Sequence, residues 1–273
     1  MANVSERPSF PARLPSNGTG ARNPRSMSSG PAIPLSPAAS TSATTLATGA
    51  GRPVGAEPDC TAVRAHMVRK IEAQGVRSTA VLQSLGAVER HRFVDSALRA
   101  QAYEDTSLPI GLGQTISKPG VVARMCELLL GAEIARGGPL GRVLEIGTGC
   151  GYQAAVLALM AREVYSIERL RGLHEKARAN LRPFRIANVH LLFGDGMVGY
   201  AKGAPYTGII AAAGGEAIPD AWCEQLAVGG RLVAPMATRA GRQTLIVMDR
   251  TSQGMRQTVL EDVHFVPLKS GIA

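Results

Sequence analysis

The pattern of hydrophobic and polar positions divides the chain near residue 59. Residues 1–58 are rich in Ser, Pro, Gly, Ala and Thr and carry few large apolar side chains. Such a segment cannot bury enough apolar surface to offset the entropy cost of ordering it, so we predict a disordered tail. A targeting segment is the alternative, because the stretch is rich in Arg and Ser and poor in acids. Residues 59–273 are periodic and predict one folded domain.

Residues 59–131 predict a helical subregion. Val63, Met67 and Ile71 recur every four positions, which places them on one face of a helix. Amphipathic spacing predicts helices over residues 60–74, 79–88, 91–103 and 118–131. The glycine-rich stretch 108–117 favours a loop or a short extended piece.

From residue 142 onward, short apolar runs alternate with amphipathic stretches. The apolar runs predict strands over residues 142–146, 163–167, 189–193, 206–212, 231–235, 243–250 and 256–265. The amphipathic stretches predict helices over residues 152–161, 170–181 and 219–226. This alternation predicts an α/β fold with a mostly parallel sheet and helices on both faces. The last strands follow each other after short breaks, so we expect an antiparallel edge.

The stretch from Glu145 to Gly151 reads Glu-Ile-Gly-Thr-Gly-Cys-Gly and links a predicted strand to a predicted helix. Glycines let the backbone approach a ligand closely, and open α/β sheets bind ligands at the carboxyl ends of their strands. A dinucleotide fingerprint requires G-x-G-x-x-G, whereas Gly147, Gly149 and Gly151 follow G-x-G-x-G. The acid at Glu145 would repel a pyrophosphate but suits a cationic ligand. Both features indicate S-adenosylmethionine, which carries an ammonium and a sulfonium.

Two further acids end the next predicted strands. Glu168 ends the second strand, where a carboxylate can accept both hydroxyls of a ribose. Asp195, between Gly194 and Gly196, ends the third strand, where the adenine edge would lie. Either acid could instead cap a helix or a turn. Three acids at successive strand ends favour S-adenosylmethionine and a Rossmann-like class I methyltransferase sheet.

The net charge of +9 raises the question of a nucleic-acid partner. The charge is spread without a block of like charges, which favours a solvated basic surface. Aromatic residues make up only 4% of the chain, too few for a platform that stacks bases. The fourth strand lacks the N-P-P-Y and D-P-P-Y patterns of amino-group methyltransferases, and no cysteine follows a proline, as is common in cytosine-C5 enzymes. We therefore expect no nucleic-acid partner.

The cysteines and histidines do not suggest a metal or a catalytic base. The four cysteines are Cys60, Cys126, Cys150 and Cys223, and none lies in a C-x-x-C pair or near a histidine at metal-site spacing. We expect reduced thiols in a cytoplasmic protein. No apolar run of about 18 residues is present, so no membrane span is expected. We expect structural or surface roles for the five histidines.

Several pieces of the chain occur in the order typical of one enzyme family. The most discriminating piece is Gln114-Thr115-Ile116-Ser117. The others are Arg92-Phe93-Val94, Leu108-Pro109-Ile110-Gly111, Val122-Ala123-Arg124-Met125, residues 143–153, Gly194-Asp195-Gly196 and Phe265-Val266-Pro267-Leu268. With these pieces, residues 59 to about 270 resemble the protein-L-isoaspartate (D-aspartate) O-methyltransferases.

This resemblance implies an activity and its partners. The enzyme would transfer a methyl group from S-adenosylmethionine to the free α-carboxyl of L-isoaspartyl residues in damaged proteins and peptides. The ester would collapse to a succinimide, whose hydrolysis returns some normal aspartate, so the process is repair. The partners would be isoaspartyl-containing proteins and peptides, and we expect a monomer.

The resemblance also implies roles for single residues. Ser117 matches the family's active-site serine and would donate a hydrogen bond to the acceptor carboxylate, with capping of the following helix as the alternative. Val266 would line the peptide site, although its position alone indicates a core strand residue. Thr115 would contact the cofactor. The expected cofactor-binding residues are Thr115, Glu145, Gly147, Thr148, Gly149, Gly151, Glu168, Asp195 and Gly196.

Three features depart from the family pattern. Gly208 stands where the fourth strand usually has an acidic residue, and residues 211–215 replace a Thr-Ala-Ala followed by prolines. Cys150 replaces the more usual serine of the glycine loop. The first two changes would loosen the floor of the acceptor site. Gly208 and the altered end of the fourth strand leave open a non-catalytic protein that retains the cofactor fold. The net charge of +9 leaves open a nucleic-acid methyltransferase as the other alternative.

Overall fold

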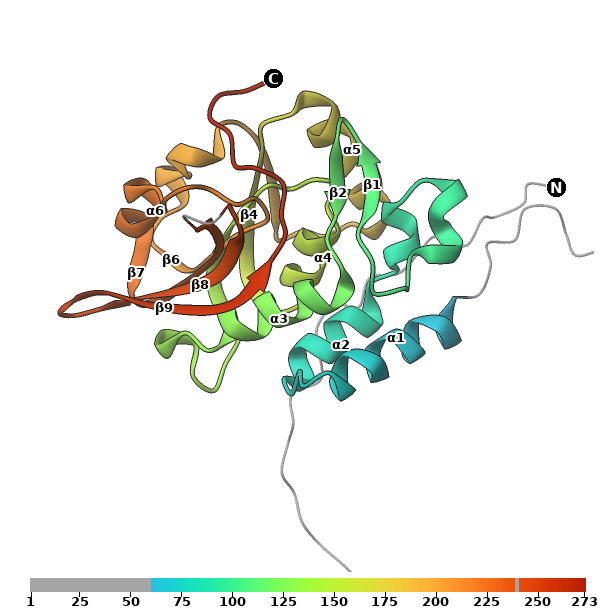
Figure 1. Ribbon diagram of the computed structural model, residues 1–273, viewed down its shortest axis with the longest axis horizontal. Coiled ribbons are helices and arrows are strands. Elements are labelled where there is room, and N and C mark those ends of the chain that lie inside the picture. The colour runs from blue at the N-terminus through green and yellow to red at the C-terminus, as the bar shows by residue number, and fades with distance from the viewer. Residues whose placement is uncertain (1–59, 239–240) are drawn as a thin grey trace, which may run out of the picture. The chain divides into compact units, whose positions relative to one another are not determined.

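The computed structural model describes residues 60–238 and 241–273 (Figure 1). The predicted tail over residues 1–58 lies outside the described residues, so both interpretations of it stay predictions. The main sheet contains β3 (Leu140–Ile146), β4 (Ala161–Glu168), β5 (Val189–Phe193), β6 (Tyr206–Ala211), β7 (Leu226–Ala237), β8 (Gln243–Thr251) and β9 (Gly254–Val263). Across this seven-stranded sheet the order is β5-β4-β3-β6-β7-β8-β9.

Most of the sheet is parallel. β3 pairs in parallel with β4 and β6, and further parallel pairs join β4 to β5 and β6 to β7. β8 is antiparallel to β7, and β9 is antiparallel to β8. The connections between these last strands are too short for a parallel crossover, which needs a dozen or more residues. The predicted mostly parallel sheet with an antiparallel edge is confirmed.

Helices cover both faces of this sheet. They are α1 (Thr61–Ala73), α2 (Thr79–Ala87), α3 (Pro119–Leu130), α4 (Tyr152–Ala158), α5 (Arg171–Leu181) and α6 (Asp220–Gln225). Val143 and Ile210 share a hydrophobic core with side chains of α1 to α5. The neighbouring strand residues Leu144 and Ile209 point to the opposite face and pack with Trp222 of α6. The prediction of helices on both faces is confirmed.

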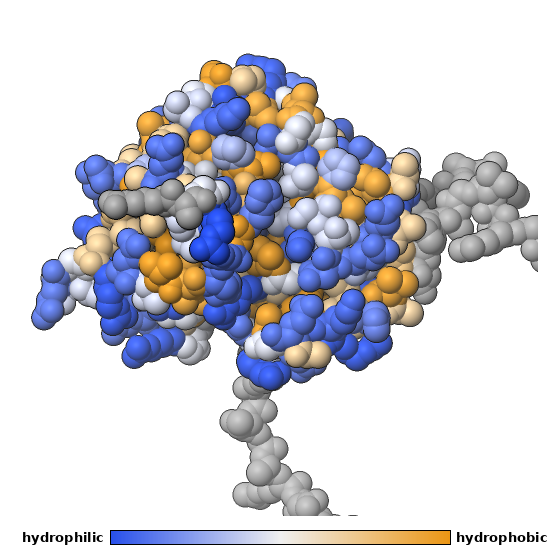
Figure 2. All heavy atoms as spheres, viewed as in Figure 1, coloured by the Kyte–Doolittle hydropathy of each residue, from blue (hydrophilic) through white to orange (hydrophobic). Residues whose placement is uncertain are grey.

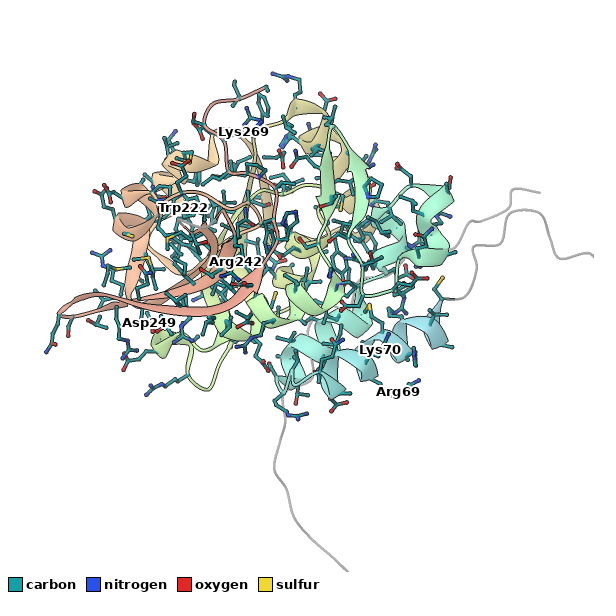
Figure 3. All side chains as sticks on the ribbon, in the orientation of Figure 1. Arg69, Lys70, Trp222, Arg242, Asp249 and Lys269 are labelled. Carbon is teal, nitrogen blue, oxygen red and sulfur yellow. The ribbon has the colours of Figure 1, made fainter. Side chains whose placement is uncertain are left out.

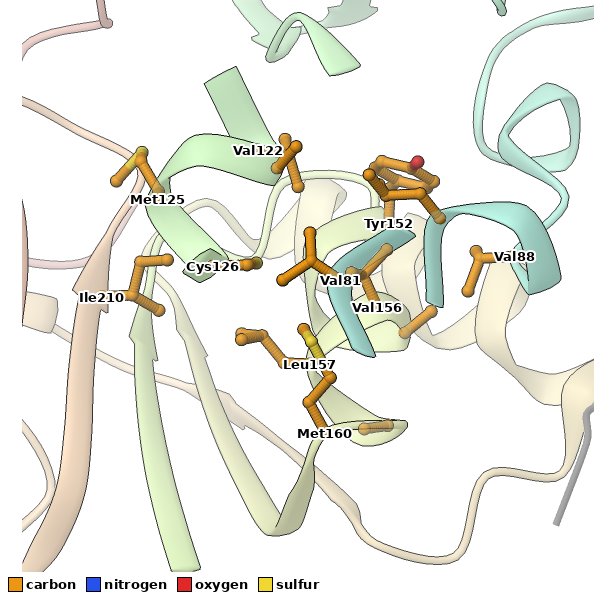
Figure 4. Packing of buried hydrophobic residues seen from close by; sticks show 14 of the residues in the cluster. Val81, Val88, Val122, Met125, Cys126, Tyr152, Val156, Leu157, Met160 and Ile210 are labelled. Atoms are coloured by element: carbon orange, nitrogen blue, oxygen red, sulfur yellow. The ribbon is translucent and has the colours of Figure 1, made fainter. Parts of the chain in front are cut away.

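A packed layer holds α3 against the sheet, where α3 contacts β6 and β7. Figure 4 shows Val81 of α2, Cys126 of α3 and Val156 of α4 meeting over the sheet, with Ile210 of β6 beside them. All four are fully buried. Apolar burial contributes about 25 cal/mol per Å², so this layer fixes where α3 begins. The residue that precedes its N-cap is Ser117.

The prediction that Val63 shares the buried face of its helix with Met67 and Ile71 is wrong. Val63 is 51% exposed, although Met67 and Ile71 of the same helix are buried. On a helix of 3.6 residues per turn, positions four apart drift by about 40° at each step. Val63 has therefore rotated away from the face that packs on α2 and α3.

The segment predicted as one helix over residues 91–103 forms two short 3-10 helices instead. These are η1 (Arg90–Phe93) and η2 (Ser96–Gln101), separated by two extended residues. The guanidinium of Arg90 donates a hydrogen bond to the carbonyl of Ala102 at 2.7 Å. Tertiary bonds of this kind fix a bent path that the helical spacing did not reveal.

The glycine-rich stretch forms a hairpin of β1 (Leu108–Gly111) and β2 (Gln114–Ile116). Its turn residues, Leu112 and Gly113, have φ angles of 52° and 70°. Positive φ at both positions matches the twist of the two strands, and Leu112 adopts it despite carrying a side chain. Because β2 leads directly into Ser117, the hairpin sets the place of that serine.

Charged side chains are distributed over several parts of the described fold. Figure 3 labels Arg69 and Lys70 on α1, Arg242 beside β8, and Lys269 in the C-terminal segment. The face in Figure 2 interleaves hydrophilic residues with smaller apolar patches. Within residues 60–238 and 241–273, no helix combines the length and apolar character needed to cross a bilayer.

Candidate active site

The glycine loop joins β3 to α4 at the carboxyl edge of the sheet. Gly147, Gly149 and Gly151 have φ angles of 90°, 55° and 90°, a region that residues with a Cβ rarely adopt. Gly147 and Gly149 line a cavity of about 460 Å³. Gly151 has a packing role, because a Cβ there would lie 3.0 Å from the Cδ1 of Leu181 on α5. The third glycine therefore lets α5 approach the start of α4.

The cavity lies where several loops converge. Its walls come from the loops after β3, β4, β5 and β6, from the β1–β2 hairpin and from the segment after β9. Its volume falls within the range of roughly 300–1,000 Å³ that is usual for small-molecule sites. The expected site residues in its wall are Thr115, Gly147, Gly149, Glu168, Gly196 and Val266. The expected residues outside its wall are Ser117, Glu145, Thr148, Gly151 and Asp195.

Glu168 ends β4 and lines the cavity although it is only 5% exposed. Its Oε2 accepts a hydrogen bond from the amide of Gly149 at 2.9 Å, and its Oε1 accepts one from the amide of Leu170 at 2.9 Å. These bonds fix the carboxylate in place. Because a carboxylate offers about four acceptor sites, Glu168 retains capacity for the hydroxyls of a ligand.

Glu145 lies behind the glycine loop. The side chain is fully buried, and its Oε2 accepts a hydrogen bond from Ser166 at 2.5 Å. The Ser166 hydroxyl is in turn 2.6 Å from the Oγ1 of Thr148. Burial raises the pKa of Glu145 to about 8. Its Oε1 makes no hydrogen bond within the described part of the chain, so a nearby cation would stabilise the ionised form.

Asp195 lies in the loop after β5 and bonds the backbone on two sides. Its Oδ1 accepts a hydrogen bond from the amide of Met197 at 2.8 Å, which is a turn cap. Its Oδ2 accepts one from the amide of Gly271 at 2.6 Å. The bond to Met197 is therefore the turn cap that was the alternative interpretation of Asp195. The bond to Gly271 attaches the C-terminal segment beside the cavity.

Gly196 lines the cavity and is held from beneath. A Cβ at this position would lie 2.6 Å from the Cγ2 of Ile146 at the end of β3. The buried Trp222 of α6, which is labelled in Figure 3, donates a hydrogen bond from Nε1 to the Gly196 carbonyl at 2.8 Å. The opposite face of the sheet thus anchors this part of the wall.

Ser117 lies between β2 and α3 and is half-buried. The N-cap of α3 is Lys118, and no side chain caps this helix, so the capping alternative is wrong. The Ser117 carbonyl accepts a hydrogen bond from Arg90 at 2.7 Å, whereas its hydroxyl bonds no residue in the described ranges. That hydroxyl therefore has no structural partner within the described ranges, although Ser117 lies outside the cavity wall.

Thr115 and Val266 belong to segments on different sides of the cavity. Thr115 is exposed on β2, two residues before Ser117. Val266 is half-buried and follows β9. Its carbonyl accepts a hydrogen bond from the amide of Gly214 at 2.9 Å, which joins the C-terminal segment to the loop after β6. Val266 is therefore a wall residue and not part of the buried core.

Sequence reasoning missed part of the cavity wall. The missed residues are Leu112, Gly113, Gln114, Ile146, Ile167, Arg169, Leu170, Ala212, Ala213, Pro267, Leu268 and Lys269. For Gln114, Ile146, Ile167, Arg169 and Pro267, which directly adjoin an expected site residue in the chain, adjacency was the available signal. Arg169 and Lys269 add positive charge to the cavity wall. The charged residues that the sequence had indicated for this site were all acidic.

Two of the three departures from the family pattern concern packing. A Cβ at Gly208 would lie 2.9 Å from the Cδ1 of Leu129 on α3, and Gly208 does not line the cavity. Burial raises the pKa of the Cys150 thiol to about 11, so it stays neutral at pH 7. Ala212 and Ala213 do line the cavity. Of the three departures, only the altered segment 211–215 therefore reaches the cavity.

The remaining titratable groups offer little acid–base chemistry at the cavity. Over the described ranges, no group of three or more His, Cys, Asp or Glu side chains is placed to hold a metal ion. All four cysteines are free thiols. His91 is buried 2.7 Å from the hydroxyl of Tyr103. No histidine lines the cavity. Its wall provides carboxylate, hydroxyl, amide, cationic and backbone groups.

The mostly parallel sheet, the glycine loop after β3 and the acid at the end of β4 together define a class I S-adenosylmethionine-dependent methyltransferase fold. The family described as protein-L-isoaspartate(D-aspartate) O-methyltransferase matches residues 62–273. The chain belongs to this family.

Two relatives show how close the match is. A protein-L-isoaspartate O-methyltransferase of Methylibium petroleiphilum is 59% identical over 221 residues, which cover 80% of this chain and 81% of the relative. The enzyme of the same name from Leptothrix cholodnii is 58% identical over 215 residues, which cover 78% of this chain and 75% of the relative.

Solved structures agree with this assignment. A protein-L-isoaspartate O-methyltransferase structure matches with a TM-score of 0.69 and 26% identity, over 77% of this chain and 67% of that one. A second structure, from Plasmodium falciparum in complex with S-adenosyl-L-homocysteine, matches with a TM-score of 0.66 and 21% identity, over 76% of this chain and 98% of that one. This second likeness shows the fold.

Proposed function

We infer that this protein transfers a methyl group from S-adenosylmethionine to the free α-carboxyl of L-isoaspartyl residues in damaged proteins and peptides. The observation that carries the inference is the family match over residues 62–273. The ester that forms collapses to a succinimide, whose hydrolysis returns some normal aspartate. The activity therefore starts a repair process.

The cavity at the carboxyl edge of the sheet suits the cofactor. S-adenosylmethionine supplies an electrophilic methyl group on a sulfonium. Gly147 and Gly149 allow close approach to the backbone, and Glu168 presents a fixed carboxylate toward the cavity. The unused Oε1 of Glu145 provides latent negative charge behind the loop. The residues proposed to hold the cofactor are Thr115, Glu145, Gly147, Thr148, Gly149, Gly151, Glu168, Asp195 and Gly196.

These residues act at two levels. Thr115, Gly147, Gly149, Glu168 and Gly196 are proposed to touch the cofactor, because they line the cavity. The others act through their neighbours. Thr148 and Glu145 share the hydrogen bonds of Ser166 beneath the loop. Gly151 sets the loop against α5, and Asp195 fixes the C-terminal wall.

The acceptor requires orientation more than activation. A carboxylate is already ionised at neutral pH, so its attack on a methyl group needs no general base. The free hydroxyl of Ser117 is proposed to donate a hydrogen bond to it, and Val266 to line the peptide side of the cavity. Proximity and orientation supply roughly 7–11 kcal/mol in well-aligned reactions. The chain's task is to exclude water and hold the carboxylate in line.

A matched pair of peptides tests the proposed function. The purified full chain is incubated with labelled S-adenosylmethionine and a synthetic isoaspartyl peptide, or with its aspartyl twin. We expect labelling of the first peptide and not of the second. Equal labelling of both peptides, or of neither, would overturn the proposal.

We propose further that the protein works as a monomer in the cytoplasm without a nucleic-acid partner. The four free thiols support a reducing compartment, and the scattered basic charge supports weak attraction for polyanions. Size-exclusion chromatography with light scattering tests the first point. Binding of RNA or DNA that weakens steeply with added salt would contradict the last.

A further inference from the structure

Arg90 of η1 is a buried cation in an unusual setting. Its side chain is fully buried, and it forms no ion pair with any carboxylate in the described ranges. Burial lowers the pKa of its guanidinium. Removing a charge from water without a counter-charge is costly. A well-packed apolar side chain would serve stability better at such a place, so packing alone does not account for an arginine.

The guanidinium of Arg90 contacts both the segment that carries Ser117 and the start of α4. Its Nε donates to the carbonyl of Ala102 at 2.7 Å, and its Nη2 donates to the carbonyl of Ser117 at 2.7 Å. Its central carbon lies 4.7 Å from the ring centre of Tyr152. Tyr152 is the first residue of α4 and directly follows the glycine loop at Gly151. One side chain therefore contacts both the serine loop and the helix behind the cofactor loop.

We propose that Arg90 is a positioning residue for methyl transfer, which holds the backbone at Ser117 in register with the start of α4. The proposal rests on the function inferred above, because the place of Ser117 matters only if its hydroxyl meets the acceptor. Arg90 does not itself touch the substrates. It acts by holding the Ser117 carbonyl, which leaves the hydroxyl of the same residue free.

The planar fork of arginine explains why this residue type is needed. Two nitrogens of one rigid group donate to two carbonyls at once, while the flat face lies against an aromatic ring. The compact ammonium of a lysine carries the same charge but cannot reproduce that geometry. Arg90→Lys therefore keeps the positive charge but removes the geometry that holds the two carbonyls. Arg90→Gln removes the charge as well and keeps a single short amide.

The experiment measures kcat and KM for a synthetic isoaspartyl peptide in the wild-type full chain and in Arg90→Lys and Arg90→Gln. The affinity for S-adenosylmethionine is measured by calorimetry, and the folded fraction by thermal unfolding. Misplacement of a reacting group typically costs about a hundredfold, so we expect kcat/KM for the peptide to fall roughly ten- to hundredfold in Arg90→Lys. Cofactor affinity should stay at the wild-type value at temperatures where the variant is folded.

Arg231 offers a matched control. It is a partly buried arginine that, like Arg90, bridges two segments: it donates to the carbonyl of Leu128 at 3.0 Å and to the carboxylate of Asp249 at 2.7 and 3.1 Å. None of these groups lines the cavity. Arg231→Lys should lower the unfolding temperature and leave the kinetics of the folded enzyme unchanged.

The possible outcomes distinguish a failure of the Arg90 proposal from a failure of the proposed methyltransferase activity. If the wild-type chain does not methylate the isoaspartyl peptide, the proposed function fails. If the wild type is active and Arg90→Lys keeps its kcat and KM, only the positioning role of Arg90 is overturned. Losses of peptide turnover and cofactor affinity in the same proportion as the folded fraction would likewise overturn it, because they indicate a structural role.

Discussion

Two serines near helix starts differ in what their hydroxyls do. Ser78 is the N-cap of α2, and its hydroxyl accepts a hydrogen bond from the amide of Val81 at 3.4 Å. Ser117 also precedes a helix, yet its hydroxyl bonds no residue in the described ranges and the cap position belongs to Lys118. A side chain without a structural partner at the edge of a site can be changed with little effect on folding, which makes the pair a clean comparison.

Ser117→Ala should reduce activity and leave stability unchanged. A hydrogen bond to a charged group contributes about 1.5–3 kcal/mol, so we expect kcat/KM for an isoaspartyl peptide to fall roughly ten- to hundredfold. Ser78→Ala should show the reverse, with a loss of about 1 kcal/mol in unfolding free energy and normal kinetics. Steady-state assays and urea denaturation of both variants measure this. A wild-type rate in Ser117→Ala would remove the serine from the proposed mechanism.

The buried Glu145 predicts a specific pH dependence of stability. Its folded-state pKa of about 8 lies above the ordinary value of 4.5 for a glutamate, because the side chain is buried. Between these values the unfolded chain releases a proton that the folded chain retains, so this residue's contribution to stability is intact below pH 4.5 and is lost as pH rises toward 8. Glu145→Gln should remove that loss, because an amide does not ionise.

Urea denaturation at several pH values measures the Glu145 effect. The difference in unfolding free energy between wild type and Glu145→Gln should fall by about 1.4 kcal/mol per pH unit within this window. Glu163→Gln, which replaces a surface glutamate on the same strand as Ser166, serves as the control for the substitution itself. Parallel pH curves for wild type and Glu145→Gln would show that Glu145 is ionised throughout.

At the scale of elements, the end of β3 contacts the loop after β5 in the cavity wall. The side chain of Ile146 at the end of β3 occupies the space where a Cβ of Gly196 would lie, at 2.6 Å. Gly194, two residues earlier, has room, since its Cβ would lie 3.8 Å from the Cγ2 of Ile167. The two glycines of the Gly-Asp-Gly piece therefore differ in purpose, although the sequence presents them alike.

Gly196→Ala should disturb the cofactor cavity, and Gly194→Ala should not. The added methyl group would push Ile146, which itself lines the cavity. Overpacking of this kind costs about 1–3 kcal/mol, and we expect weaker binding of S-adenosylmethionine together with lower stability. Isothermal titration calorimetry on both variants tests the contrast. Equal cofactor affinity in Gly196→Ala and wild type would show that Ile146 moves freely out of the way.

The presence of most helices and strands could be predicted from the sequence, but the hydrogen-bond partners of the polar side chains could not. Apolar runs and glycine spacing predicted β3, the loop and α4, because these depend on neighbours along the chain. The bond from Asp195 to Gly271 joins residues 76 positions apart, and that from Arg90 to Ser117 joins residues 27 apart. Such pairings depend on how loops converge, and no local pattern specifies them. The 3-10 path over residues 90–101 escaped prediction for the same reason.

At the scale of the whole molecule, the family match and the first helix begin at nearly the same residue. The family match begins at residue 62, and α1 begins at Thr61. The buried side chains of Met67 and Ile71 tie α1 to the hydrophobic core. The segment 1–58 lies outside both the match and the expected domain. We therefore expect residues 59–273 to form the methyltransferase domain, and the role of the preceding segment can be tested by removing it.

A variant that starts at residue 59 should be folded and active. All expected site residues and every element of the sheet lie within the retained part. Because termini outside a packed domain contribute little to its contacts, we expect kcat/KM and unfolding temperature to match the full chain to within about twofold and a few degrees. Parallel kinetic assays and thermal melts of the two proteins measure this. A large loss of activity at unchanged stability would show that residues 1–58 take part in substrate capture, and a large loss of stability would show that the domain extends into them.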